Sequence, residues 1–149
     1  MTPPAAGDLS YLFHALGQVV VAGGHVEREM RHTLVRLGDG PRWDFTRVRP
    51  MPWATLVRDI NNAATGRSDE AQIRAVMAVE PSLNARRNTA VHTAWRLDAD
   101  QLPAVFGSRV QVKKAPYTIV ASLQNFTDTA HELFLFCDQL RTIAADRHW

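Results

Sequence analysis

The sequence predicts an all-α fold, a bundle of four to five helices with a small β-hairpin or extended insertion before the last helix. Apolar residues recur at helical spacing along most of the chain. Residues 96–126 break this pattern with prolines, a glycine and short alternating apolar runs. With 149 residues, 46% hydrophobic and 21% charged, the chain fits one globular domain over residues 1–149.

The first predicted helix follows a loose leader over residues 1–7, with Asp8 as its N-cap. Gly23 and Gly24 interrupt it and predict a kink or a close helix contact, and "GDGP" over residues 38–41 ends it. Its apolar residues predict one buried stripe, formed by Leu9, Leu12, Phe13, Leu16, Val19, Val20, Val26, Met30, Leu34 and Leu37.

Two shorter helices are predicted after an irregular, basic segment over residues 42–52. Ser68, followed by two acidic residues, predicts the start of the second of them. Glu80–Pro81 predicts a break, after which the helix resumes through Trp95. The first of the two is amphipathic, with Trp53, Leu56, Val57, Ile60 and Ala64 on its apolar side.

The last predicted helix begins at Thr127 as its cap, after the insertion in which Val110, Val112 and Ile119 alternate with other residues. Its inward residues are predicted to be Leu133, Phe134, Cys137, Leu140 and Ile143. The single cysteine cannot form an internal disulfide, and its apolar neighbours predict a small buried side chain. A lone buried thiol fits a reducing compartment.

The sequence lacks the characteristic motifs of several function classes. We expect no membrane span, because the most apolar early run, "LGQVVVAGG", is short and rich in glycine. The N-terminal residues have neither the basic region nor the apolar core of a signal peptide, so we expect a cytoplasmic protein. With no glycine-rich phosphate loop and no Cys/His zinc spacing, we expect no cofactor and no metal site.

Arginine provides almost all of the basic residues, 15 of the 17 lysines and arginines, although the formal net charge is only +2. Its planar fork suits phosphate contacts. Arg42, Arg47 and Arg49 flank Trp43 and Phe45, a mixture that predicts either RNA contacts or an ordinary solvated loop. The four tryptophans are expected mainly as core or interface anchors.

The segment "LNARRNTAVHTAW", residues 83–95, carries the most chemistry. On a helix, Asn88 and His92 are neighbours, and the long Arg87 side chain reaches the same side. Histidine transfers protons near neutral pH, arginine stabilises charge on phosphate oxygens, and an amide orients either group. Such a set can act on a phosphodiester without a metal ion.

The string "RNTAVH", Arg87 to His92, resembles the Rx4-6H motif of the HEPN superfamily, with the polar Asn88 after the arginine. The resemblance implies an all-helical, metal-independent endoribonuclease, often a toxin or defence effector, that dimerises so that two motifs face one site. It implies that Arg87 contacts the scissile phosphate, His92 acts as acid or base, and Asn88 positions the site. The product would be a 2′,3′-cyclic phosphate.

Around this motif, Arg86 is expected to make a secondary phosphate contact. The partners expected are RNA, a second copy of the chain, and a protein regulator such as an antitoxin. An alternative is a non-catalytic helical module for protein interaction or oligomerisation, in which residues 83–95 form a hydrated helix face. His92 would then bond a backbone carbonyl, and Arg87 would pair with a carboxylate.

Overall fold

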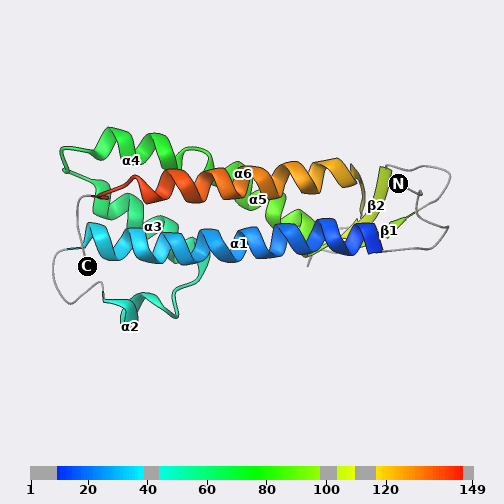
Figure 1. The fold of residues 1–149 in the computed structure, drawn as a ribbon, viewed down its shortest axis with the longest axis horizontal. Coiled ribbons are helices and arrows are strands. Elements are labelled where there is room, and N and C mark those ends of the chain that lie inside the picture. The colour runs from blue at the N-terminus through cyan, green and yellow to red at the C-terminus, as the bar shows by residue number, and fades with distance from the viewer. Residues whose placement is uncertain (1–9, 39–43, 98–103, 110–116, 146–149) are drawn as a thin grey trace. The chain divides into compact units, whose positions relative to one another are not determined.

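The computed structural model describes residues 10–38, 44–97, 104–109 and 117–145. The described residues are mostly helical, as predicted, and they form two compact units. One unit comprises residues 1–22 and 83–132, and the other comprises residues 23–82 and 133–149. The elements are α1 (Ser10–Leu37), α2 (Phe45–Val48), α3 (Trp53–Ala64), α4 (Glu70–Met77), α5 (Glu80–Val91), β1 (Ala94–Leu97), β2 (Ala104–Arg109), β3 (Tyr117–Ser122) and α6 (Leu123–Arg141) (Figure 1).

Helix α1 runs unbroken through Gly23 and Gly24. Among the described residues, no atom outside the adjoining backbone of α1 lies within 4 Å of where a Cβ on Gly24 would be, so the expected close contact is wrong at that residue. The buried stripe is narrower than predicted, because Phe13 and Val20 are 63% and 55% exposed. The buried positions are Leu12, Ala15, Val19, Ala22, Val26, Met30, Leu34 and Leu37, which are three or four residues apart.

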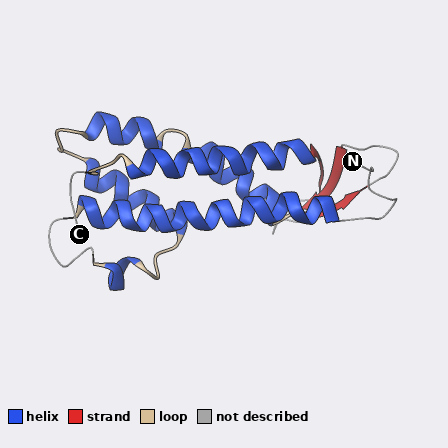
Figure 2. Ribbon diagram, viewed as in Figure 1, coloured by secondary structure: helices blue, strands red, loops and turns tan. Residues whose placement is uncertain are grey.

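The insertion before the last helix is a three-stranded antiparallel sheet in the order β1-β2-β3 (Figure 2). The predicted alternation at Ile119 falls on β3, whereas Val110 and Val112 lie outside the described residues. In this register, Gly107 of β2 is paired with Trp95 of β1 and with Ile119 of β3. The sheet packs with α5 and α6 residues of its unit around Leu83, Ala90, Val105, Phe126 and Ala130, all buried.

Helix α6 begins at Leu123, whereas an N-cap at Thr127 would start it at Asp128, five residues later. The Ser122 backbone N–H donates to Asn125 Oδ1 at 2.7 Å, and the Asn125 N–H donates to Ser122 Oγ at 3.2 Å. This reciprocal pair satisfies backbone donors that a helix start leaves open. Thr127 instead donates its hydroxyl to the Leu123 carbonyl within the helix.

The second unit has its core between the latter part of α1, α3, α4 and the end of α6. Helix α3 has the predicted bounds and buries Trp53, Leu56, Ile60 and Ala64. The N-cap of α4 is Asp69, one residue after the predicted Ser68. In α6, Leu133, Phe136 and Cys137 are buried, whereas Phe134, predicted to face inward, is exposed.

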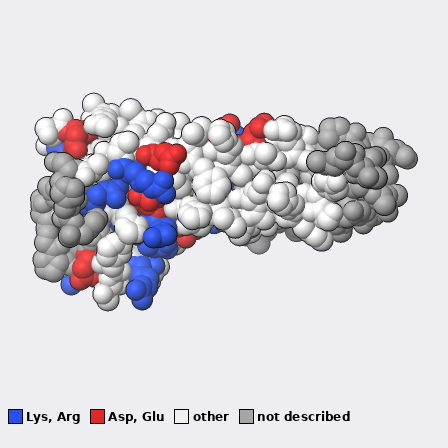
Figure 3. Space-filling model, in the orientation of Figure 1, with Lys and Arg blue, Asp and Glu red and all other residues white. Residues whose placement is uncertain are grey.

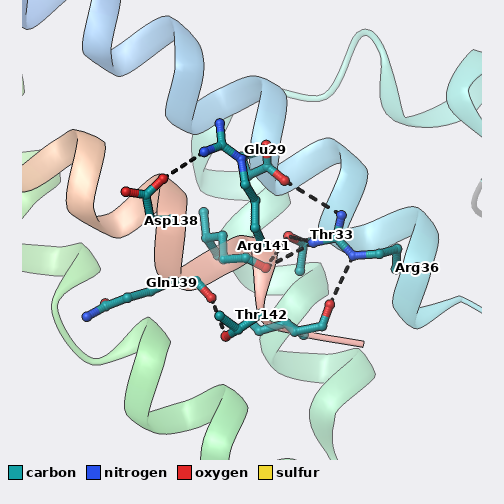
Figure 4. A network of polar contacts seen from close by, with 9 residues as sticks. Glu29, Thr33, Arg36, Asp138, Gln139, Arg141 and Thr142 are labelled. Atoms are coloured by element: carbon teal, nitrogen blue, oxygen red, sulfur yellow. Dashed lines mark hydrogen bonds and ion pairs between the residues drawn. The ribbon is translucent and has the colours of Figure 1, made fainter. Parts of the chain in front are cut away.

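A buried arginine joins α1 to the end of α6 in this unit (Figure 4). Arg36, only 8% exposed, donates from Nε to the Ile143 carbonyl and from Nη2 to the Leu140 carbonyl, both at 2.9 Å. Its Nη1 lies 3.6 Å from Glu29, which also pairs with Arg141 at 3.3 Å. A charged donor therefore binds the carbonyl of Leu140, in the last turn of α6, and the carbonyl of Ile143, in the turn that follows the helix.

Tryptophan and cysteine side chains behave as the sequence predicts where they are described. Trp53 is buried, and its Nε1 donates to Glu80 at 2.7 Å. Cys137 is buried, and burial raises the pKa of its thiol to about 11. None of the described helices combines the length and apolar character that crossing a membrane needs.

Candidate functional site

The RNTAVH segment lies at the end of α5, in the unit that holds the sheet. Leu83 and Ala90 are buried and anchor this part of the helix. Asn84, Arg87 and Asn88, at spacings of three and four residues, share another side of the helix and are half-buried. The helical setting predicted for Arg87 and Asn88 is therefore confirmed.

The helix was predicted to continue through Trp95, but it ends at Val91. Residues 94–97 pair with β2 instead, and the Trp95 indole N–H donates to the Ala90 carbonyl at 2.8 Å. The Trp95 ring packs edge-on against Phe126, with centroids 4.9 Å apart. Sheet pairing and this indole bond outweigh the local helical pattern, so His92 lies in the turn that follows the helix.

Arg87 and Asn88 are in direct contact. Arg87 Nη1 donates to Asn88 Oδ1 at 3.2 Å, so the amide oxygen orients the guanidinium. The backbone N–H of His92 donates to the Asn88 carbonyl at 2.9 Å. This bond extends the helical pattern one residue beyond α5 and holds His92 on the side of Asn88.

The His92 side chain is exposed at this turn, in contact with solvent rather than in the core. An exposed imidazole can exchange protons with a bound substrate. The Arg87 guanidinium, five residues earlier in the chain, can bind two phosphate oxygens at once. The segment thus carries a proton-transfer group and a phosphate-binding group, each bonded to Asn88.

Arg86 makes a different contact from the Arg87 and Asn88 pair. Its Nη2 pairs with Glu132 on α6, and this bond lowers the pKa of the Glu132 carboxyl. Arg86 and Glu132 lie at the edge of a cavity of about 390 Å³. The other lining residues are Ala85, Thr89, Ala90, Trp95, Ile119, Ala121, Asn125, Phe126, Asp128 and Thr129.

This cavity lies on the side of α5 away from Arg87 and Asn88, because none of the three motif residues lines it. Its walls are mainly apolar, formed by alanines, Ile119, Trp95 and Phe126. Arg86 was predicted to contact a phosphate, but in this structure its guanidinium pairs with the Glu132 carboxylate.

Asn84 is a residue that the sequence reasoning missed. It lies four residues before Asn88 on the same side of α5. Its Oδ1 is buried and accepts no hydrogen bond from the residues that the structure describes. The signal was present in the sequence, as an amide one turn before the motif, but an asparagine is common on any hydrated helix face.

The other arginines predicted to contact RNA belong to the second unit. Arg42 and Trp43 lie outside the described residues. Arg47 and Arg49 are exposed on or directly after α2, whose start is capped by a bond from the Arg47 N–H to Asp44 Oδ1 at 3.0 Å. These residues are therefore not part of the unit that holds the RNTAVH segment.

Arg49 lines a groove of about 300 Å³ together with Arg28, Arg31, His32 and Phe45; we call these five residues the basic groove. His32 and Phe45 meet edge-to-face with centroids 4.9 Å apart. Burial lowers the pKa of His32, and the nearby Arg28 and Arg36 lower it further, against an opposing effect of Glu29. The imidazole is therefore mainly neutral at neutral pH.

Among the ranges that the structure describes, no three His, Cys, Asp or Glu side chains lie together as metal ligands would. No protein-family model, curated protein or solved structure matches this chain. An assignment of function therefore depends on the chain's own residues and their chemistry.

Proposed function

We propose that the chain is a metal-independent endoribonuclease of HEPN type, with Arg87, Asn88 and His92 as its site. The observation that carries the proposal is the geometry of the RNTAVH segment: Arg87 is hydrogen-bonded to Asn88 at 3.2 Å, and the exposed His92 is held by a 2.9 Å backbone bond to the Asn88 carbonyl. Arg87 and Asn88 lie on a helix, as the motif does in that family, whereas His92 lies in the turn after the helix.

In the proposed reaction, the ribose 2′-hydroxyl attacks the adjacent phosphorus and the bond from phosphorus to the 5′-oxygen breaks. The products are a 2′,3′-cyclic phosphate and a 5′-hydroxyl. His92 either accepts the proton of the 2′-hydroxyl or donates one to the leaving oxygen. Arg87 stabilises the charge that develops on the phosphate oxygens, and Asn88 orients its guanidinium.

The biological setting proposed with this activity is a cytoplasmic toxin or defence effector that works as a homodimer and has a protein regulator. The resemblance to the HEPN family supports these points. Overexpression would then slow growth, and His92→Ala would relieve the effect. Growth inhibition by His92→Ala equal to that of the wild type would contradict this setting.

The enzymatic test is incubation of the folded protein with labelled single-stranded RNA and tRNA in EDTA. We expect cleavage by the wild type and a loss of about 100-fold or more in His92→Ala, the lower range for removal of an acid–base group. His131→Ala is the matched control, because His131 is an exposed histidine on α6 of the same unit. Equal cleavage by the two variants would overturn the proposal.

A non-catalytic interaction module is the second candidate function. The exposure of Phe13 and Val20, which are seven residues apart on α1 and so share a face, favours it. If wild-type protein cleaves no RNA and sediments as an oligomer that Phe13→Ser dissociates, the module is the better description. If the wild-type protein cleaves RNA, protein interaction is not its whole function.

A further inference from the structure

The basic groove of the second unit combines cationic, aromatic and neutral hydrogen-bonding side chains. Arg28, Arg31 and His32 come from α1, whereas Phe45 belongs to α2 and Arg49 follows it. Figure 3 shows Lys and Arg side chains near α2 and the adjoining part of α1, with Asp and Glu side chains among them. Residues from two separate elements therefore line one concave site.

The charges in this groove are only partly compensated. Arg31 pairs with Glu27 at 3.4 Å and also donates to the Met51 carbonyl at 3.1 Å. Arg28 and Arg49 make no ion pair with any of the described residues, and both are exposed. Two guanidinium groups at the groove are thus available to an anionic ligand.

Glu29, the residue after Arg28 on α1, already pairs with two arginines. Glu29 pairs with Arg36 at 3.6 Å and with Arg141 at 3.3 Å. A second hollow of about 190 Å³, lined by His25, Arg28, Glu29, His32 and Arg141, adjoins the groove through the shared Arg28 and His32. From position 25 to position 32 the helix rises about 10 Å, so the two adjoining hollows follow α1 over about that length.

Phe45 adds a different kind of contact. Its ring is 41% exposed and is held edge-to-face by His32. An exposed aromatic ring beside arginines is how proteins bind single-stranded nucleic acids, with bases stacked on the ring and phosphates on the guanidinium groups. A ligand with phosphates alone would leave the ring unused.

We infer that the basic groove binds single-stranded RNA, with phosphates on Arg28 and Arg49 and a base stacked on Phe45. This inference rests on the proposed function for its choice of RNA. The groove belongs to a different unit from the RNTAVH segment. It is a binding site for the substrate rather than part of the reacting set.

The test measures binding of a fluorescent single-stranded RNA of ten uridines to the full chain carrying His92→Ala, so that cleavage does not interfere. We expect Arg28→Gln with Arg49→Gln to weaken binding about tenfold or more at moderate salt, for two lost charge-assisted phosphate contacts. The slope of log affinity against log salt is expected to fall by about 1.4, from about 0.7 for each phosphate contact to a single strand.

Phe45→Leu is expected to weaken binding about fivefold or more while leaving the salt slope unchanged, because it removes stacking and no charge. Arg58→Gln is the matched control, since Arg58 has a side chain 66% exposed on α3 of the same unit and does not line the groove. Circular dichroism and thermal unfolding confirm that each variant is folded.

Equal binding by the Arg28/Arg49 double variant and by Arg58→Gln would overturn the inference, even if the wild type cleaves RNA. If inorganic polyphosphate competes as well as RNA and Phe45→Leu has no effect, the groove is a general anion site and the inference is also wrong. If binding depends on all three residues but no variant or wild type cleaves RNA, the inference holds and the proposed catalytic function fails.

Discussion

Arg36→Met tests whether the buried arginine holds α1 to the end of α6. The substitution keeps a long side chain but removes every donor. The Ile143 carbonyl loses its 2.9 Å bond, whereas the Leu140 carbonyl keeps a 3.1 Å bond from the Ile143 backbone N–H and a 3.4 Å bond from the Thr33 hydroxyl. The acceptors are main-chain carbonyls, which remain buried when the arginine is removed. The free-energy cost of taking them out of water is then no longer offset by the bonds from Arg36.

An orphaned buried acceptor costs about 1–3 kcal/mol, and removing one partner of a buried charged pair costs about 3–5 kcal/mol. Because Glu29 retains Arg141 at 3.3 Å, we expect the lower end, about 3 kcal/mol of unfolding free energy. At about 3 °C per kcal/mol for a chain of this size, Tm falls by about 9 °C.

The assay is thermal and urea unfolding followed by circular dichroism. Arg36→Lys retains the charge without the fork and is expected to fall between wild type and Arg36→Met. Arg58→Met, at an exposed position of the same unit, controls for the loss of one arginine and should stay within about 0.5 kcal/mol of wild type. If Arg36→Met unfolds within about 2 °C of that control, the anchoring argument is refuted.

Three further predictions follow from single contacts. Gly107→Ala places a Cβ against Thr93 Cγ2 and is expected to lower stability by about 1–3 kcal/mol in urea unfolding; wild-type stability would mean the packing is looser. Cys137, with its pKa raised to about 11, should resist a thiol reagent at pH 8 until urea unfolds the chain, and rapid labelling of native protein would contradict its burial. The ion pair with Arg86 lowers the pKa of the Glu132 carboxyl below its ordinary value of 4.5. The pair therefore stabilises the folded chain at pH values above 4.5, and this stabilisation is lost as the pH falls through the folded-state pKa. Glu132→Gln should therefore lose less stability than the wild type when the pH falls below 4.5, by a difference of less than about 0.5 kcal/mol for an exposed pair. If both proteins lose the same stability in that pH range, the bond is not formed in solution.

The helical character of the chain was predictable because apolar spacing is a local property. The bounds of α3 and the burial of Leu133, Cys137 and Leu140 follow directly from that spacing. Periodicity does not show how wide the buried face is, so Phe13 and Phe134 were wrongly predicted to face inward.

The ends of α5 and α6 depend on contacts that the local pattern does not contain. Strand pairing and the indole bond of Trp95 end α5 at Val91, and the Ser122 and Asn125 pair starts α6. The role of Arg36 was equally hidden, since a charged residue on a helix is normally expected at the surface.

The candidate site was predictable only where its residues are close in sequence. Arg87 and Asn88 are adjacent in the chain and in contact. The basic groove was found in part, through Arg49 beside Phe45, but Arg28 and His32 come from α1. Arg28 and His32 come close to α2 only through tertiary folding, which no local sequence motif predicts.

The chemistry of the RNA ends is the most direct test of the proposed site. Wild-type protein and His92→Ala are incubated with a defined RNA in EDTA, and the 3′ ends of the fragments are identified by mass spectrometry. The account predicts 2′,3′-cyclic phosphates from the wild type and almost none from His92→Ala. Fragments with 3′-hydroxyl ends, or cyclic phosphates formed equally by both proteins, would contradict the assignment of His92 and the 2′-hydroxyl mechanism.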